Sequence, residues 1–170
     1  MKNINKIAII GIGGTGKTTL AKILSKKLNL PVIHRDQLIF LKNWELADET
    51  KIEKQFLENL KKDKWIIEGY IHPASSARFK FADLIIYLDY SAFQALLGAL
   101  KRWLTHRGKK REEMAEGCIE TLDFEILKNI YKKYEKQEIE KLVNNYPKKV
   151  IRLKSRKEMK KYIKKQFDIN

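Results

Sequence analysis

A short strand, a glycine-rich loop and a helix are predicted to follow one another between Lys6 and Leu24. Ile7 to Ile10 is a run of mostly β-branched residues, which favours a strand, and apolar residues recur at helical spacing from Leu20 onward. The loop begins at Gly11, which is followed by four residues and then by Gly-Lys-Thr. This spacing is the Walker A pattern, in which glycines allow successive backbone N–H groups to surround an anion at a helix N-terminus. The rest of the chain is therefore expected to be organised around a phosphate-binding loop.

The residues of this loop have separate predicted tasks. Lys17 is expected to contact the β- and γ-phosphates of a nucleoside triphosphate, and the Thr18 hydroxyl is expected to hold Mg²⁺. The predicted nucleotide-binding residues are Gly11, Gly13, Gly14, Thr15, Gly16, Lys17, Thr18 and Thr19.

The same glycines also fit a second nucleotide-binding pattern. Gly11, Gly13 and Gly16 spell G-x-G-x-x-G. Asp36 lies about 20 residues beyond, where a dinucleotide-binding fold places the acid that binds the ribose. Lys17 decides between the two patterns, because triphosphate chemistry needs a lysine at the phosphate position and a dinucleotide fold does not.

Length and composition are those of one α/β domain. The chain has 170 residues, and we expect residues 1–170 to form a single domain. The first apolar run is too short for a signal peptide or a membrane span, which makes the cytoplasm the expected location. The one cysteine, Cys118, lies in a polar region without a neighbouring base, which favours a reduced thiol over a nucleophile.

Short apolar runs alternate with helical patterns along the rest of the chain. Further strands are predicted at 31–33, 65–67, 84–88 and 150–153, and helices around 52–60, 73–78, 93–104, 124–134 and 159–167. The helix over 93–104 is expected to pack on the sheet through Phe93, Leu96, Leu97, Leu100 and Leu104. This alternation predicts a parallel sheet with helices on both faces.

A dense cluster of positive charge lies at the end of the helix over 93–104. Lys101 to Arg111 carries six basic residues around Gly108 and no acid before Glu112. We predict a mobile cationic loop over this segment.

Seven segments carry a resemblance to a known family. They are IIGIGGTGKTTLAKIL, PVIHRDQL, the Trp44 loop, WIIEGY, RFKFADLIIYLD, HRGKKREEMAEGCIE and VIRLKSRKEM. In this order and spacing they resemble the bacterial family called DNA topology modulation protein, which is similar to adenylate kinases and other P-loop small-molecule kinases. The resemblance implies a three-layer P-loop NTPase fold with a five-stranded parallel sheet in the order 2-3-1-4-5 and an arginine-bearing lid over 101–117. It also implies ATP binding and nucleoside or nucleotide kinase activity.

The resemblance further implies residues for the metal and the second substrate. Glu68 is similar to the acid after the third strand that adenylate-kinase-like proteins place near Mg²⁺, although those more often carry Asp. Asp89 also ends a strand, one that fits a Walker B pattern better, but Glu68 is favoured for the metal; the alternative for Asp89 is an acid near a helix N-cap. Asp36 is a candidate acid for orienting the acceptor, or a turn cap. Arg35 and Arg78 are candidate clamps, because a guanidinium binds phosphate bidentately, although Arg35 also fits a solvated surface charge.

Arg102, Arg107 and Arg111 fall on the lid positions of the family. The resemblance implies that they are catalytic, since arginines above a transferred phosphoryl group stabilise its charge while a closed lid excludes water. The alternative is a solvated basic loop. Gly98 departs from the family, which usually has there a further arginine able to stack on the nucleotide base.

Other charged and metal-binding residue types have simpler interpretations. The formal net charge is +15, and basic residues crowd the last part of the chain, where they could contact nucleic-acid phosphates. The lysines of the last helix nevertheless oppose Met159, Ile163 and Phe167, as on a solvated helix face. His34 and His106 lack a second ligand at metal spacing and are expected to be hydrogen-bonded or exposed.

Two functions follow from the sequence. The first is transfer of the γ-phosphoryl group of ATP, with Mg²⁺, to a small acceptor: a nucleoside monophosphate, a nucleoside or another small metabolite. The second is nucleotide-regulated nucleic-acid binding that affects DNA topology. The three lid arginines favour the first function, and Arg35 and Arg78 favour a monophosphate acceptor because they match its charge.

Overall fold

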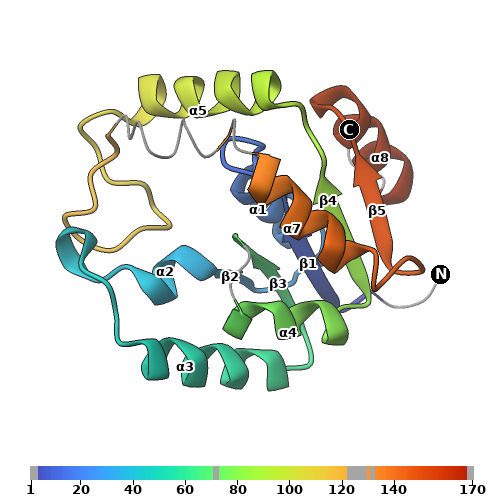
Figure 1. Ribbon diagram of the computed structural model, residues 1–170, viewed down its shortest axis with the longest axis horizontal. Helices are drawn as coiled ribbons and strands as arrows, with labels where there is room; N and C mark the ends of the chain where they lie inside the picture. Colours follow the sequence, from blue (N-terminus) through green and yellow to red (C-terminus); the bar gives the residue numbers. More distant parts are fainter. Residues whose placement is uncertain (1–3, 71–72, 122–129, 131–132, 168–170) are drawn as a thin grey trace.

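One sheet of five parallel strands, with helices on both of its faces, forms the centre of the fold (Figure 1). The computed structural model describes residues 4–70, 73–121, 130 and 133–167. In chain order the strands are β1 (Lys6–Ile10), β2 (Val32–His34), β3 (Trp65–Glu68), β4 (Leu84–Leu88) and β5 (Val150–Leu153). Their order in the sheet is β2-β3-β1-β4-β5, which confirms the predicted P-loop NTPase fold.

Strand β1 lies at the centre of the sheet, between β3 and β4. Ile7 and Ile9 belong to one hydrophobic core, and Ala8 and Ile10 to the core on the opposite face, all with 0% exposure. Successive side chains of a strand face opposite ways, so a strand covered on both faces needs an uninterrupted apolar run. This burial fixes the end of β1, where the glycine-rich loop begins.

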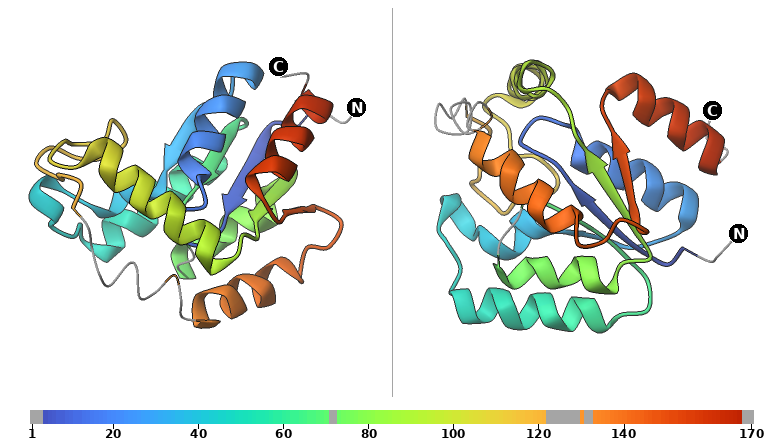
Figure 2. Two further views of the ribbon diagram at one scale, coloured as in Figure 1. Left: turned by 90° about the horizontal axis from the view of Figure 1, so that it is seen from above. Right: turned by 45° about the vertical axis from the view of Figure 1, so that its right-hand side comes forward.

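Different sets of helices cover the two faces of the sheet (Figure 2). On one face lie α1 (Lys17–Leu28) and α8 (Arg156–Phe167). The other face is covered by α3 (Glu49–Lys61), α4 (Pro73–Phe81), α5 (Ala92–His106) and α7 (Lys133–Val143). Two short elements, α2 (Arg35–Ile39) and the 3₁₀ helix η1 (Lys42–Trp44), connect β2 to α3.

Helix α5 does not pack as its sequence predicts. Phe93, Leu97 and Leu104 are 65%, 47% and 63% exposed, so the predicted packing face is wrong at these positions. The buried residues are instead Ala95 and Ala99. Helix α5 lies directly on the glycine-rich loop, because a Cβ at Gly14 would collide with the Ala95 carbonyl oxygen and a Cβ at Gly98 would collide with the Gly14 carbonyl oxygen.

Three further predictions differ from the structure or lie outside it. The segment predicted as a loop around Trp44 contains α2 and η1, whose short lengths leave no periodicity to detect. Helix α5 continues to His106, so Lys101 and Arg102 are helical and the cationic loop begins at Arg107. The helix predicted over 124–134 lies mostly outside the described residues, and α7 follows it at 133–143.

Within the described ranges, every helix is too short or too polar to cross a membrane.

Candidate nucleotide and acceptor site

The glycine-rich loop connects the end of β1 to the start of α1. Gly14 and Gly16 adopt left-handed backbone conformations, with φ of 76° and 90°. The Thr15 hydroxyl donates to the carbonyl oxygen of Ile12 at 2.8 Å, and Lys17 Nζ donates to the same oxygen at 3.0 Å. Helix α1 begins after Gly16, which has no side chain to cap the first N–H groups of the helix. The loop therefore has the wrapped geometry and the helix N-terminus that a phosphate needs.

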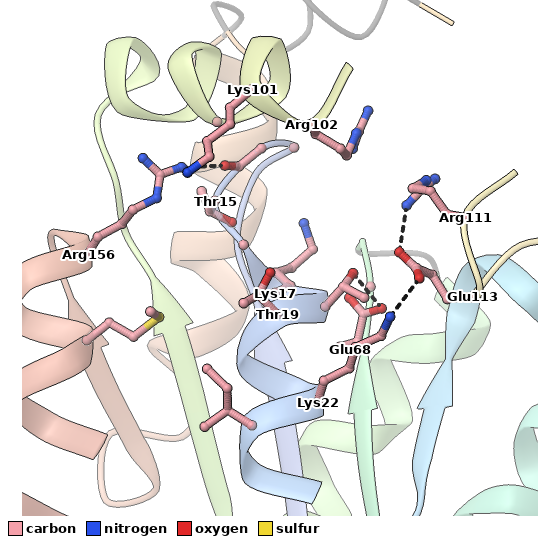
Figure 3. A pocket seen from close by; sticks show the side chains of 18 of the residues that line it. Thr15, Lys17, Thr19, Lys22, Glu68, Lys101, Arg102, Arg111, Glu113 and Arg156 are labelled. Atoms are coloured by element: carbon pink, nitrogen blue, oxygen red, sulfur yellow. Dashed lines mark hydrogen bonds and ion pairs between the residues drawn. The ribbon is translucent and has the colours of Figure 1, made fainter. Parts of the chain in front are cut away.

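A cavity of about 1310 Å³ opens above this loop (Figure 3). Its walls come from the glycine-rich loop and α1, the ends of β3 and α2, helix α5 with the lid segment 101–117, and α8. Lining residues include Lys17, Thr18, Thr19, Asp36, Glu68, Tyr70, Arg102, Arg111 and Arg156. Elements that are far apart in the sequence thus surround one space, with the predicted phosphate loop at its base.

A buried carboxylate lies beside the first turn of α1. Glu68, at the end of β3, is 4% exposed, and its Oε1 accepts a hydrogen bond from Thr18 Oγ1 at 3.2 Å. His34 Nδ1, at the end of β2, lies 2.8 Å from the same oxygen. Burial disfavours the ionised form of Glu68, but the His34 hydrogen bond and the charge of Lys17 outweigh it and hold the pKa of Glu68 below its usual range. Glu68 therefore presents an ionised carboxylate next to the Thr18 hydroxyl.

These two oxygens fit a magnesium ion, which prefers oxygen ligands and usually keeps several waters beside one or two protein groups. Groups of three His, Cys, Asp or Glu side chains at metal-binding distance do not occur in the described part of the chain. A Mg²⁺ ion at this site would accordingly take most of its ligands from phosphate and water.

The three predicted acceptor residues have different positions relative to the cavity. Asp36 lines it, and its side chain is 43% exposed. The Arg35 side chain is 13% exposed and packs against Gly69, where an added Cβ would lie 2.6 Å from Arg35 Cβ. Arg78 has no exposed surface and lies behind the cavity wall, where Nη2 donates to the carbonyl oxygens of Gly69 and Tyr70 at 3.0 and 3.2 Å.

Arg78 is incompletely hydrogen-bonded. Its Nε and Nη1 atoms are buried and have no acceptor among the described residues. Burial, together with the nearby charge of Arg35, lowers the pKa of Arg78 from 12.5 to about 9. Gly69 and Tyr70 line the cavity but Arg78 does not, so its predicted role as a clamp on the acceptor stays a prediction and requires this part of the wall to open.

Two of the three lid arginines line the cavity. Arg102 comes from the last turns of α5 and Arg111 from the loop that follows, and both pair with Glu120, which is 3% exposed. Arg107 is instead exposed, and its guanidinium lies 5.8 Å from the centre of the Trp103 ring. The predicted catalytic role of Arg107 stays a prediction and requires the lid to move.

The lid segment is connected to α1 across the cavity. Lys22 Nζ, on α1, lies 2.9 Å from Glu112 Oε2 and 3.1 Å from Glu113 Oε2. Glu113 also accepts a hydrogen bond from Arg111 Nη1 at 3.2 Å, so it lies between Arg111 and Lys22 (Figure 3). Lys22 and Glu113 were not predicted from the sequence, because lysines and glutamates are common on helix and loop surfaces.

The far end of the lid docks on η1 (Figure 1). The backbone N–H of Asn43 donates to the carbonyl oxygen of Glu116 at 3.0 Å. Cys118 is buried, and its Sγ accepts from the Trp44 N–H at 3.3 Å and donates to the Leu41 carbonyl oxygen at 3.2 Å. Cys118 thus has a packing role between two loops, as expected of a reduced thiol without a neighbouring base.

Helix α8 contributes an arginine on the other side of the phosphate loop. Arg156 Nη2 donates to the carbonyl oxygen of Gly14 at 3.3 Å. A Cβ at Gly98 would collide both with that oxygen and with Arg156 Nη2. An arginine therefore lies beside position 98, but it comes from α8 rather than from α5.

The remaining candidates have structural partners. Asp89 pairs with Lys136 at 2.6 Å and with Arg152 at 3.0 Å, whereas Ser91 caps α5. Asp89 therefore lies just before the cap of α5, as its alternative interpretation expects, and it does not line the cavity. His34 is hydrogen-bonded, as expected, although its partner Glu68 was not foreseen.

Comparisons with known proteins agree with this geometry. A model of the family described as ATPases associated with various cellular activities (AAA) matches residues 7–69, from β1 to the residue after β3. No curated protein matches the chain in sequence. Among solved structures, the chain is similar to shikimate kinase from Bacteroides thetaiotaomicron, with 17% identity, a TM-score of 0.53 and coverage of 98% of this chain and 99% of that one.

A second similar structure is shikimate kinase from Aquifex aeolicus, with 21% identity, a TM-score of 0.51 and coverage of 94% of this chain and 92% of that one. The fold is that of the P-loop kinases. These comparisons do not show the topology modulation family, so that resemblance stays a prediction.

Proposed function

We propose that the protein is a P-loop phosphotransferase that transfers the γ-phosphoryl group of ATP to a small acceptor. The observation that carries this proposal is that the phosphate loop, the Thr18–Glu68 pair and two lid arginines line one cavity. A phosphate switch without transfer chemistry does not need two arginines in the cavity of the phosphate loop. The fold shared with solved kinases adds support.

The residues of the phosphate loop, the Thr18–Glu68 pair and the two lid arginines have separate tasks in this proposal. The N–H groups at the start of α1 and the Lys17 ammonium bind the phosphates, which replace the Ile12 carbonyl as the partner of Lys17. Thr18 and Glu68 hold Mg²⁺, and His34 keeps the Glu68 carboxylate oriented. When bound, Mg²⁺ neutralises charge on the phosphate oxygens. Arg102 and Arg111 stabilise the charge of the group in transfer, and the closed lid excludes water.

The acceptor is proposed to be anionic. Arg78 offers two buried N–H groups that lack an acceptor among the described residues, and Arg35 adds a second positive charge nearby. A nucleoside monophosphate would match both charges. The second candidate is a small alcohol that carries a carboxylate, which Asp36 favours because it lines the cavity and could orient a hydroxyl group and take its proton.

The experiment that tests the function is a screen for ADP release from ATP·Mg²⁺ that depends on an added nucleoside, nucleotide or hydroxy acid. Acceptor-dependent release by the wild type, lost in Lys17→Ala, is expected. If no acceptor stimulates release, while ATP still binds, the protein is not a kinase of these compounds.

A crossed pair of variants then tests the acceptor class. Arg78→Ala is expected to abolish turnover of a monophosphate, because that acceptor depends on the guanidinium. Should Asp36→Asn eliminate turnover of a nucleoside while Arg78→Ala barely changes it, a hydroxyl kinase is the better description.

Nucleic-acid binding, the second function predicted from the sequence, has less support. Arg152 pairs with Asp89 and Glu140, and Arg156 lines the cavity, so both are engaged within the molecule. Binding of duplex DNA that weakens steeply with salt and responds to ATP would revive this alternative.

A further inference from the structure

Glu120 contacts two arginines of the cavity without lining the cavity itself. Its Oε1 accepts a hydrogen bond from Arg102 Nε at 2.6 Å, and its Oε2 lies 2.8 Å from Arg111 Nε. The carboxylate is almost fully buried, with a side-chain exposure of 3%. Each of its oxygens therefore serves a different arginine, and each arginine comes from a different element.

Both contacts use the Nε atom, which lies at the inner end of the guanidinium. The terminal nitrogens of Arg102 have no partner among the described residues, and Nη1 of Arg111 reaches Glu113. Arg102 Nε is hydrogen-bonded to the carboxylate, whereas Arg111 Nε is close to it without the alignment of a hydrogen bond. A carboxylate beside Nε leaves terminal N–H groups for other acceptors, and both arginines line the cavity. The carboxylate also offsets the repulsion between two neighbouring guanidinium groups and restricts their rotamers before any ligand arrives.

The backbone around Glu120 is anchored as well. Its N–H donates to the Lys109 carbonyl oxygen at 3.0 Å, and its carbonyl oxygen accepts from the Gly108 N–H at 3.3 Å. These bonds tie the residue to the cationic loop from which Arg111 emerges. The position of the carboxylate is thus fixed by the same segment that it orders.

We propose that Glu120 is a positioning residue for phosphoryl transfer, which holds Arg102 and Arg111 so that their terminal N–H groups face the group in transfer. The inference rests on the proposed function. Glu120 acts only through the two arginines, because it does not reach the cavity itself.

The test compares Glu120→Gln, which keeps the shape and loses the charge, with Glu116→Gln as the matched control. Glu116 is an exposed glutamate of the same lid segment, and its Oε2 lies 3.7 Å from Lys110 Nζ. Glu120→Gln is expected to lower kcat at least about tenfold and to leave the KM for ATP within about twofold, because the arginines act mainly in the transition state. Glu116→Gln is expected to keep both values within about twofold of the wild type.

A second arm separates positioning from a general structural role. In a background that carries Arg102→Ala and Arg111→Ala, Glu120→Gln is expected to cause less than about a twofold further loss, because the groups through which it acts are gone. An equal loss in both backgrounds would overturn the proposal.

A binding arm does not depend on the acceptor. Calorimetry compares ADP·Mg²⁺ alone with ADP·Mg²⁺ plus aluminium fluoride, which mimics the transferring phosphoryl group. Aluminium fluoride is expected to tighten the binding of ADP·Mg²⁺ to the wild type at least about tenfold. Glu120→Gln should lose most of this gain in affinity but bind ADP·Mg²⁺ alone as the wild type does. If Glu120→Gln does not fold, Glu120→Asp, which keeps the charge but shortens its reach, replaces it with the same expectation.

The outcomes separate the two proposals. The wild type could bind ADP·Mg²⁺ more tightly with aluminium fluoride and yet transfer phosphate to no acceptor. This result contradicts the proposed kinase, but it supports the role of Glu120 if Glu120→Gln loses the gain in affinity. A fluoride effect that is absent from the wild type, or that is unchanged in both Glu120 variants, overturns the role of Glu120.

Discussion

Arg78 is a charged side chain with no exposed surface, and replacing it by Met is expected to stabilise the unliganded protein. The pKa of Arg78 falls from 12.5 to about 9 through burial and the charge of Arg35. At about 1.4 kcal/mol for each pH unit, this fall corresponds to a penalty on the charged form on the order of 5 kcal/mol. The penalty is present throughout the range in which the folded arginine is protonated, and it would be relieved only as the pH rises above about 9.

Methionine also loses favourable contacts. The hydrogen bonds from Nη2 to the Gly69 and Tyr70 carbonyl oxygens are lost, and this loss cancels on the order of 3 kcal/mol of the stabilisation gained by removing the buried charge. The expected net gain is about 2 kcal/mol, because a well-packed apolar side chain often replaces a buried charge without loss. For a chain of this size the gain corresponds to a rise in Tm of about 4–8 °C.

Urea and thermal unfolding without substrates measure this effect, and Arg107→Met is the control because Arg107 is exposed. The control is expected to leave the Tm within about 2 °C, since the exposed guanidinium contributes only a weak contact with the Trp103 ring. In parallel, Arg78→Met should lose turnover of an anionic acceptor. A fall in the Tm of Arg78→Met by more than about 3 °C would refute the reasoning, because it would mean that the buried guanidinium stabilises the fold.

Shorter predictions concern Lys17, Glu68 and two lid arginines. Lys17→Ala should abolish turnover with ATP·Mg²⁺ and weaken its binding, because the ammonium is expected to bind the phosphates, while the Tm should stay within about 2 °C; kinetics, calorimetry and thermal unfolding check these results. Glu68→Gln should weaken Mg²⁺-dependent ATP binding at least about tenfold. Because the pKa of Glu68 is lowered, its ionised form stabilises the folded wild type at pH values above the usual carboxyl pKa. The difference in Tm between the wild type and Glu68→Gln should therefore shrink as the pH falls through the lowered pKa, which measurements of Tm against pH will show. Arg111→Ala should lower kcat at least about tenfold with a small change in ATP affinity, whereas kinetics of Arg107→Ala should show a smaller loss.

Much of the fold could be predicted because the strands have simple patterns. The apolar runs before Gly11, Glu68 and Asp89 mark buried parallel strands, and the glycine spacing fixes the loop between β1 and α1. Helix α5 was harder, because periodicity identifies an apolar face without saying what it meets. There the partners are the core and the backbone of the glycine-rich loop, which approaches Ala95 and Ala99 closely, while several larger side chains are exposed.

The candidate site also has residues that the sequence could predict and residues that it could not. The predicted phosphate-binding residues follow from a local motif, but Glu120, Glu113 and Lys22 contact partners farther away in the sequence. Glutamate and lysine are ordinary surface residues, and nothing local distinguishes a buried glutamate between two arginines from an exposed one. Arg78 could be named from the resemblance, yet its burial behind the cavity wall could not, since it depends on how α4 packs against the end of β3.

The close approach of Gly98 to the phosphate loop limits how this protein and its relatives can differ. A side chain at position 98 would occupy the place of the Arg156 guanidinium and would press on the Gly14 carbonyl. A chain with an arginine at position 98 must therefore direct it away from the loop and move or lose the arginine from α8. Positions 98 and 156 are expected to covary, with glycine at 98 accompanying arginine at 156 and arginine at 98 accompanying the loss of arginine at 156. An arginine would then lie beside this edge of the loop in either case, supplied by α8 or by α5.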